Sequence, residues 1–424
     1  MILIYWKWKV WTAIAKLCEA VDKKYEIKDD KDSLDDFWKY EYIIPSPWIP
    51  PTHKIYSTWK ILGELDFAYS QLPSWFKVLS VTWTDWKSTT SWMLYNILLK
   101  EFGNDKVFLS WNFDIPFSQT VADILNNWLK KWYIVVEISS FMAYNINTFK
   151  SDYSIFTNFD SDHLNWHEGI DDYFNSKVKL INNTIFKCAM NISVLESKER
   201  LLIKNSLNDL AGKIRYFGIS NSKELKDRVE LPYIIISWRK KYDIRETNFS
   251  WWFNAENLLS ASIITNELWI CSKRTKRYLQ EIKWLPHRIE LYKEKSWIRY
   301  IDDSKSTSCQ ALKAALSSFE NNIILIAWWI DKWDTFFWLE ECIRWKVRFA
   351  SLIWQTKVFL SKKFESENID YKICHDMDEA VREAINNAKV WDIVLLSPWC
   401  ASLDMFSSYE DRANKFKESV DKYA

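Results

Sequence analysis

Glycine is nearly absent from this sequence. Its 424 residues include 5 glycines and 28 tryptophans, although average glycine usage of about 7% would supply roughly 30 glycines. The combined count of glycine and tryptophan is therefore close to the number of glycines expected in a chain of this length. One interpretation is a tryptophan-rich protein that stacks sugars or bases on its indoles. The other is a single population of glycine positions in which most glycines are written as tryptophan.

Paired cysteines, an excess of charge and long apolar runs are missing too. The seven cysteines are scattered without a CxxC pair, which argues against a disulfide framework or zinc ribbon and favours a reducing cytoplasm. The balance of 57 Lys+Arg against 56 Asp+Glu does not suggest a general nucleic-acid or acidic-membrane binder. No uncharged apolar run approaches the roughly 20 residues of a membrane span. We expect a soluble, cytoplasmic monomer that binds neither nucleic acid nor membrane.

The tryptophans occupy places that are typical of glycine. In "LIYWKWKVW", Trp6, Trp8 and Trp11 have the spacing G-x-G-x-x-G, after an apolar strand and at the start of a helical pattern. In "NELWI" and "AKVWDIVLL" a tryptophan stands at a helix end or strand entry, where a C′ glycine is expected. We hypothesise that most of the tryptophans occupy codons, UGA for example, that the source organism reads as glycine. The candidates for genuine tryptophans are Trp38, Trp128, Trp166 and Trp252.

The stretch "VTWTDWKSTTSW" (81–92) predicts a phosphate-binding loop. With glycine at Trp83 and Trp86 it becomes G-T-D-G-K-S-T-T, between the apolar strand "FKVLSV" and a helix. Lys87 would contact the β- and γ-phosphates of ATP, and Ser88 or Thr89 would bind Mg²⁺. The alternative is a turn capped by a lysine. The predicted nucleotide-binding loop comprises Trp83, Thr84, Asp85, Trp86, Lys87, Ser88 and Thr89.

Other polar residues suggest metal binding. Glu137 ends the apolar run "YIVVE", which places a carboxylate at the carboxyl end of a strand and suits Mg²⁺ beside nucleotide phosphates. The alternative is an edge-strand carboxylate in solvent. His163 and His167 in "DHLNWH" are four residues apart and could form a zinc pair, but no HExxH glutamate or third ligand accompanies them.

Short apolar strands alternate with amphipathic helices along the chain, which predicts an α/β protein with parallel sheets. We divide it into a Rossmann-like N-terminal domain (1–74), a central P-loop ATPase domain (75–284) and a Rossmann-like C-terminal domain (285–424). A dehydrogenase interpretation of the first motif leaves the second nucleotide site unexplained.

Several motifs in order resemble the Mur ligases nearly end to end. They include "SPWIP" (46–50), "EISSF" (137–141), "DHLNWH" (162–167), "WLPHRIE" (284–290), "DDSKST" (302–307) and "LLSPWCASLDMF" (395–406). The last three resemble the members that add D-glutamate. The resemblance implies an ATP-dependent ligase that joins D-glutamate to UDP-N-acetylmuramoyl-L-alanine through an acyl phosphate, for peptidoglycan precursors. A sister ligase for another amino acid, or a non-catalytic tryptophan-rich binding protein, remains the alternative.

The resemblance also assigns the catalytic and metal-binding roles. It implies two Mg²⁺ ions, with Ser88 and Glu137 beside the nucleotide and His163 as a ligand of the second ion. It places His167 at the periphery. Lys177 in "NSKVKL", which would ordinarily be a solvated helical lysine, becomes a lysine that CO₂ carbamylates into a metal ligand, in preference to its neighbour Lys179.

The remaining roles concern nucleotide and substrates. The resemblance implies that Asn254 lies near the nucleotide, with Phe253 replacing a family histidine, and that Arg288 and Asp303 lie near the ATP phosphates and ribose. Without it, Arg288 and Asp303 could be surface ions, and Asn254 a helix cap. Trp6, Trp8 and Trp11 would surround the UDP diphosphate. The other predicted substrate residues are Asn112, Thr307, Lys332, Ser402 and Tyr409.

Overall fold

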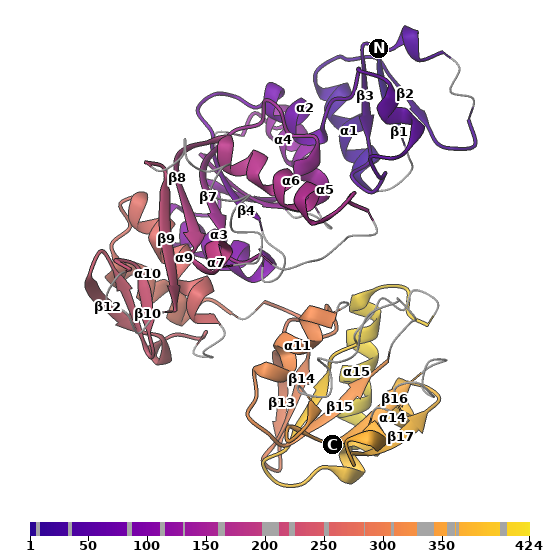
Figure 1. The fold of residues 1–424 in the computed structure, drawn as a ribbon, viewed down its shortest axis with the longest axis vertical. Helices are drawn as coiled ribbons and strands as arrows, with labels where there is room; N and C mark the ends of the chain where they lie inside the picture. Colours follow the sequence, from indigo (N-terminus) through magenta and orange to yellow (C-terminus); the bar gives the residue numbers. More distant parts are fainter. Residues whose placement is uncertain are drawn as a thin grey trace. The chain divides into compact units, whose positions relative to one another are not determined.

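The chain folds into two compact units, Met1–Lys283 and Trp284–Ala424 (Figure 1). The computed structural model describes residues 1–5, 9–32, 36–82, 87–110, 115–129, 132–159, 166–196, 212–219, 225–249, 254–283, 285–306, 309–328, 343–353, 361, 364–398 and 405–424. No helix among these residues has both the length and the apolar composition needed to cross a bilayer. Four described cysteines are free, and three of them are buried.

The first unit begins with a small parallel sheet. Strand β1 (Ile2–Tyr5) lies between β2 (Tyr25–Lys28) and β3 (Tyr42–Pro45). All four residues of β1 are buried, as an uninterrupted apolar run in a central parallel strand requires. Helix α1 (Lys9–Ala20) follows β1. The predicted start of the chain, a strand followed by a helix, is therefore confirmed.

A nine-stranded sheet forms the rest of the first unit, in the order β12-β11-β10-β9-β8-β7-β4-β6-β5. Neighbouring strands from β10 to β5 are parallel, whereas β10, β11 and β12 are antiparallel. The strands are β4 (Lys77–Thr82), β5 (Val107–Ser110), β6 (Tyr133–Ile138), β7 (Ser151–Phe156), β8 (Thr184–Asn191), β9 (Ile214–Ile219), β10 (Arg228–Glu230), β11 (Tyr233–Ile236) and β12 (Arg239–Asp243). The helices are α2 (Glu64–Gln71), α3 (Lys87–Phe102), α4 (Phe117–Asn126), α5 (Ser140–Tyr144), α6 (Ile170–Asn182), α7 (Ser193–Glu196), α9 (Ala255–Glu267) and α10 (Ser272–Glu281).

One hydrophobic core joins the two sheets of the first unit. It contains Ile4 and Leu17 from the small sheet and its helix, together with Val121 and Ile134 from the nine-stranded part. Helices α1 and α2 both pack against α4. The predicted boundary at residue 74 therefore falls inside a compact unit, because the apolar faces of these helices cover one another.

The second unit contains a six-stranded sheet in the order β13-β14-β18-β15-β16-β17. Only the β13–β14 pair is antiparallel. Its elements are β13 (Glu290–Lys295), β14 (Ile298–Asp302), α11 (Cys309–Ser317), β15 (Ile323–Ala327), β16 (Val347–Ile353), β17 (Asp370–Cys374), α14 (Met377–Asn387), β18 (Ile393–Leu396) and α15 (Tyr409–Tyr423). Helices α14 and α15 pack against each other and contribute to its core. The predicted α/β class with mainly parallel sheets is confirmed.

Candidate active site

Helix α3 begins where a central parallel strand ends. Strand β4 lies between β6 and β7 and ends at Thr82, and α3 begins at Lys87. Ser88 and Thr89 are buried in the first turn of α3. A helix N-terminus at the carboxyl edge of a parallel sheet presents backbone N–H groups and a positive dipole end to an anion. This is the surrounding structure that a phosphate-binding loop at 83–86 requires.

Glu137 lies beside the end of β4. It pairs with Val81 across the β4–β6 ladder, and its exposed fraction is 3%. Strand β6 has β4 on one side and β5 on the other. The interpretation of Glu137 as an edge-strand carboxylate in solvent is therefore wrong, because Glu137 is a buried residue of an internal strand, next to the strand that leads to Lys87.

An asparagine pair on α9 contacts the first turn of α3. The Thr90 hydroxyl donates to Asn257 Oδ1 at 3.1 Å, and Asn257 Nδ2 donates to Asn254 Oδ1 at 3.4 Å. Asn254 occupies the N-cap position of α9, as the cap interpretation predicts, but its side chain makes no capping hydrogen bond. Its Nδ2 is buried and has no partner among the described residues. Since a buried amide donor is costly when unpaired, this atom suits an acceptor on a ligand beside α3.

Lys177 is fully buried on α6. Its exposed fraction is 0%, and its Nζ lies 4.6 Å from the centre of the Tyr173 ring. The interpretation of Lys177 as a solvated helical lysine is therefore wrong. Lys179, two residues further along, donates from Nζ to the Tyr144 carbonyl, and burial lowers the pKa of this side chain. The structure thus gives Lys179 a backbone partner of its own.

His167 belongs to the same buried region as Lys177. Its Nδ1 lies 2.8 Å from Asp172 Oδ2, and its ring packs on Trp166, Phe141 and Tyr173. Burial, with a smaller contribution from the Lys177 charge, holds the pKa of His167 below its usual value. Sequence reasoning placed His167 at the periphery, and it missed Tyr173 and this aromatic contact. The four-residue spacing of His163 and His167 was the sequence signal that could have drawn attention to His167.

In the second unit, three predicted substrate residues follow neighbouring parallel strands. Thr307 follows β14, Ser402 follows β18 and Lys332 follows β15, and β18 pairs with both other strands. The loops after these strands therefore begin at one edge of the sheet, where α/β proteins bind ligands. The three residues themselves lie outside the described part of the chain.

Asp303 is buried at this edge. It accepts hydrogen bonds from the Ile289 N–H at 3.2 Å and the Ser397 hydroxyl at 2.9 Å. Burial raises the pKa of Asp303 to about 7, although the Arg288 charge opposes the shift. The interpretation of Asp303 as a surface ion is therefore wrong, since its exposed fraction is 2%.

The raised pKa of Asp303 predicts a pH-dependent stability. Between the unfolded value of about 3.9 and the folded value, the folded chain keeps a proton that the unfolded chain releases. Asp303 therefore makes unfolding easier as the pH rises from about 4 to about 7. We expect the free energy of unfolding of the Asp303→Asn protein, relative to that of the parent, to increase between about pH 4 and pH 7. Urea titrations at several pH values measure this difference. A constant difference between the two proteins would contradict the assignment.

Tyr409 lies at the start of α15, close to two basic residues. Its ring is 5.8 Å from the His287 ring, and Lys305 Nζ lies 4.8 Å from the Tyr409 ring centre. The structure thus brings Tyr409 together with residues of the "LPHR" and "DDSKST" motifs. Sequence reasoning did not select His287.

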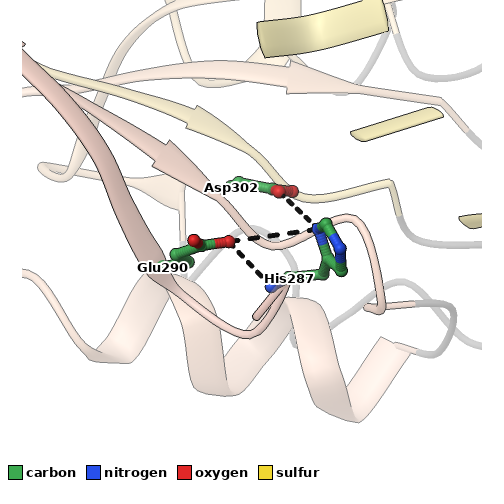
Figure 2. A group of neighbouring side chains, drawn as sticks. All are labelled: His287, Glu290 and Asp302. Carbon is green, nitrogen blue, oxygen red and sulfur yellow. Dashed lines mark hydrogen bonds and ion pairs between the residues drawn. The ribbon is translucent and has the colours of Figure 1, made fainter. Parts of the chain in front are cut away.

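His287, Glu290 and Asp302 point toward one another in the second unit (Figure 2). Their ligand atoms lie within 4.8 Å of each other, as at a metal site. However, Lys417 Nζ lies 3.0 Å from Glu290 and 3.3 Å from Asp302. An ammonium already lies within ion-pair distance of both carboxylates, so the arrangement is that of an ion network rather than a metal centre.

Removing this ammonium should destabilise the second unit. We expect Lys417→Met to lower the free energy of unfolding by about 1–3 kcal/mol, because the buried Asp302 carboxylate loses its counter-charge. Urea denaturation measures the loss, and Lys415→Met, which removes a more exposed lysine of the same helix, is the matched control. Restoration of stability by added Mg²⁺ or Zn²⁺ in the Lys417→Met protein alone would show a metal site instead.

The other predicted site residues divide between the described and undescribed parts of the chain. Trp11 is partly buried in α1 and packs on the core of the first unit. The predicted site residues that lie outside the described ranges are Trp6, Trp8, Trp83, Thr84, Asp85, Trp86, Asn112, His163, Thr307, Lys332 and Ser402.

Solved structures share this architecture. A MurF ligase from Thermotoga maritima in complex with ADP aligns with a TM-score of 0.58 at 16% identity, covering 91% of this chain and 90% of that one. The UDP-N-acetylmuramate–alanine ligase of Thermotoga maritima aligns with a TM-score of 0.64 at 14% identity, covering 100% of this chain and 99% of that one. At such low identities the similarity concerns the fold.

Sequence relatives are more specific. A model of the Mur ligase middle domain matches residues 81–265. The UDP-N-acetylmuramoylalanine–D-glutamate ligase of Aquifex aeolicus (strain VF5) is 33% identical over 390 residues, which cover 89% of this chain and 87% of the relative. The enzyme of the same name from Hydrogenobaculum sp. (strain Y04AAS1) is 30% identical, with 99% and 98% covered. The chain therefore belongs to the Mur ligase family, in its group of UDP-N-acetylmuramoylalanine–D-glutamate ligases.

Proposed function

We propose that this protein uses ATP to join D-glutamate to UDP-N-acetylmuramoyl-L-alanine in the synthesis of peptidoglycan precursors. The observation that carries the proposal is the position of Lys87 at the start of α3, which follows β4, while the neighbouring strand β6 carries the buried Glu137 opposite Val81 of β4. A cation, a carboxylate and a helix N-terminus at one sheet edge can bind the phosphates of ATP and a divalent ion. The names of the curated relatives supply the two substrates.

The reaction has two steps. An oxygen of the substrate's terminal carboxylate attacks the γ-phosphorus of ATP, and ADP leaves. The amine of D-glutamate then attacks the acyl carbon, phosphate leaves, and the amine loses a proton as the amide forms. Lys87 and the N–H groups of the loop before α3 would hold the transferred phosphoryl group, because positioning and charge neutralisation dominate such transfers.

Two Mg²⁺ ions would supply further neutralisation of phosphate charge. Ser88 and Glu137 would hold one ion, and His163 with a carbamylated Lys177 would hold the other. The full burial of Lys177 supports this role, because a carbamate buried at this position would need a counter-charge, which a bound metal ion would supply. The separate carbonyl partner of Lys179 supports the choice between the two lysines.

Further residues would bind the nucleotide and the two substrates. Trp6, Trp8 and Trp11, as glycine positions, would surround the UDP diphosphate, with Asn112 nearby. Asn254, Arg288 and Asp303 would contact ATP, and the unpaired Asn254 Nδ2 supports the first of these. The common edge of β14, β18 and β15 supports a site for D-glutamate formed by Thr307, Lys332, Ser402 and Tyr409. We place the enzyme in the cytoplasm as a monomer that binds neither nucleic acid nor membrane.

Isotope transfer tests the reaction. With heavy oxygen in the terminal carboxylate of UDP-N-acetylmuramoyl-L-alanine, one labelled oxygen should appear in the released phosphate, because the acyl phosphate breaks at its acyl carbon. The protein should carry glycine at positions 83 and 86. Release of phosphate should require D-glutamate, and L-alanine, L-lysine and diaminopimelate should not replace it. Unlabelled phosphate would contradict the acyl-phosphate route, and release with another amino acid would identify a sister ligase.

A further inference from the structure

We propose that the tryptophans at positions 128, 238, 269, 297, 345 and 391 are glycines in the functional protein, whereas Trp92 and Trp166 are tryptophans. The proposal rests on backbone geometry and on hydrogen bonds, so it is independent of the activity proposed above. It turns a hypothesis about the composition of the chain into an assignment of individual positions.

The six positions have left-handed backbone conformations. Their φ values are 49°, 63°, 63°, 62°, 68° and 76° in the order of the chain. In the described residues 13 non-glycine positions have positive φ, and these six tryptophans form the largest group. Because a Cβ clashes with the following carbonyl in this conformation, glycine adopts it readily and bulky side chains rarely do.

Two of the six end helices as a C′ glycine does. After α4, the N–H of Trp128 bonds to the Leu125 carbonyl at 3.4 Å and that of Leu129 to the Ile124 carbonyl at 3.1 Å. After α9, Trp269 bonds in the same way to Asn266, and Ile270 to Thr265. These paired bonds, with a left-handed residue at C′, define the Schellman motif, in which C′ is usually glycine.

Two others form two-residue hairpin turns. Ser237 and Trp238 join β11 to β12, and Ser296 and Trp297 join β13 to β14. Both residues of each turn have positive φ. This is the type I′ turn that the twist of the flanking strands favours, and glycine is the preferred second residue.

The last two occupy the third position of tight turns. The Lys346 N–H bonds to the Ile343 carbonyl across Trp345, and the Asp392 N–H bonds to the Lys389 carbonyl across Trp391. A four-residue turn with positive φ at its third residue is type II in pattern, and this residue is normally glycine. All six positions therefore belong to three turn types that share a need for glycine.

The indoles at these positions do little packing. Their exposed fractions run from 57% at Trp238 to 90% at Trp269. Within the described residues, Trp297 and Trp391 pack ring against ring with centroids 4.9 Å apart, and the Arg228 guanidinium lies 5.7 Å from the centre of the Trp238 ring. A surface that stacks sugars or bases would gather its rings on one face, whereas these follow turns in both compact units. The tryptophan-rich binding surface is thus the weaker explanation.

Trp92 and Trp166 behave differently, because their indole N–H groups are used. Trp92 Nε1 donates to the Lys283 carbonyl at 3.0 Å from the interior of α3, where glycine would weaken the helix. Trp166 Nε1 donates to the Trp48 carbonyl at 3.1 Å, and its ring packs on Phe141. Of the four tryptophans that the sequence suggests as genuine, Trp166 is retained and Trp128 is reassigned.

The gene and the natural protein test the assignment. We expect one codon, UGA for example, at all six positions and the ordinary UGG at 92 and 166. Peptides from the natural protein should carry glycine at the six positions and tryptophan at the two, by mass spectrometry. UGG at the six positions, or tryptophan in their peptides, would overturn the proposal. So would glycine in the peptides at 92 or 166.

A stability comparison gives a second readout. Recombinant protein with glycine at the six positions should unfold at a higher temperature than the chain with tryptophan there. Trp166→Gly should lower the unfolding temperature of the same protein, because it removes a buried ring and a hydrogen bond. A six-glycine protein that melts at or below the temperature of the tryptophan chain would contradict the assignment, whatever the enzymatic activity of either protein.

Discussion

Protein with glycine at positions 83 and 86 should release phosphate from ATP when both substrates are present, and protein with tryptophan there should be at least about a thousand-fold slower. Four residues, 83–86, connect the end of β4 to the start of α3. A phosphate must approach their backbone N–H groups closely, and two indoles would occupy that space. The forced left-handed conformation would add a cost of about 1–2 kcal/mol per residue. Steady-state phosphate release measures the difference.

A control substitution tests whether replacing any tryptophan by glycine changes the rate, or only replacement at positions 83 and 86. Trp59→Gly changes a side chain that is 97% exposed in a turn and is not one of the predicted site residues, so it should leave the rate unchanged. Circular dichroism should show the same helix content in all of these proteins. Equal rates with tryptophan and glycine at 83 and 86 would refute the phosphate loop.

Lys177→Gln should lower kcat at least about a hundred-fold, because the proposed carbamate is lost together with a metal ligand. The parent enzyme should also lose activity when CO₂ and bicarbonate are removed and regain it when they return. The residual activity of Lys177→Gln should not respond to CO₂. If Lys177 were only a packing residue, the activity of the parent enzyme would not depend on CO₂.

Lys179→Gln on the same helix is the control. Lys179 is part-buried, and its Nζ contacts the Tyr144 carbonyl and ring. Its replacement should lower the unfolding temperature while kcat keeps its dependence on CO₂. If Lys177→Gln retains the parent kcat, or if Lys179→Gln abolishes the response to CO₂, the assignment of the carbamylated lysine is wrong.

Local sequence patterns were sufficient to predict the elements around the nucleotide site. The apolar run before Lys87 and the run that ends in Glu137 each become a buried strand of the parallel sheet, as the patterns indicate. Contacts between distant segments were not predictable in this way. The burial of Lys177 depends on rings such as Tyr173 and on the packing of α6, and no short motif records them. The burial of His167 among aromatic rings was hidden for the same reason.

The domain boundary at residue 74 shows a similar limit. Composition and motifs marked the change from one nucleotide-binding pattern to the next, but the apolar faces of α1, α2 and α4 pack into one core. The sequence did not predict the left-handed backbone conformation at Trp128 either. A tryptophan at a helix end cannot be distinguished from an ordinary aromatic residue until its φ is known.

The shared core of the first unit has a consequence for the energetics of the first reaction step. If the small sheet binds the UDP part of the acceptor and α3 binds ATP, the two substrates are held by one compact unit whose core contains both Leu17 and Ile134. The two substrates must lose translational and rotational freedom before the carboxylate can attack the γ-phosphate. Because folding has already brought the two binding sites into one compact unit, much of this freedom is lost on binding, before each reaction. Mutations in this core, far from any phosphate, should consequently lower the effective molarity of the carboxylate.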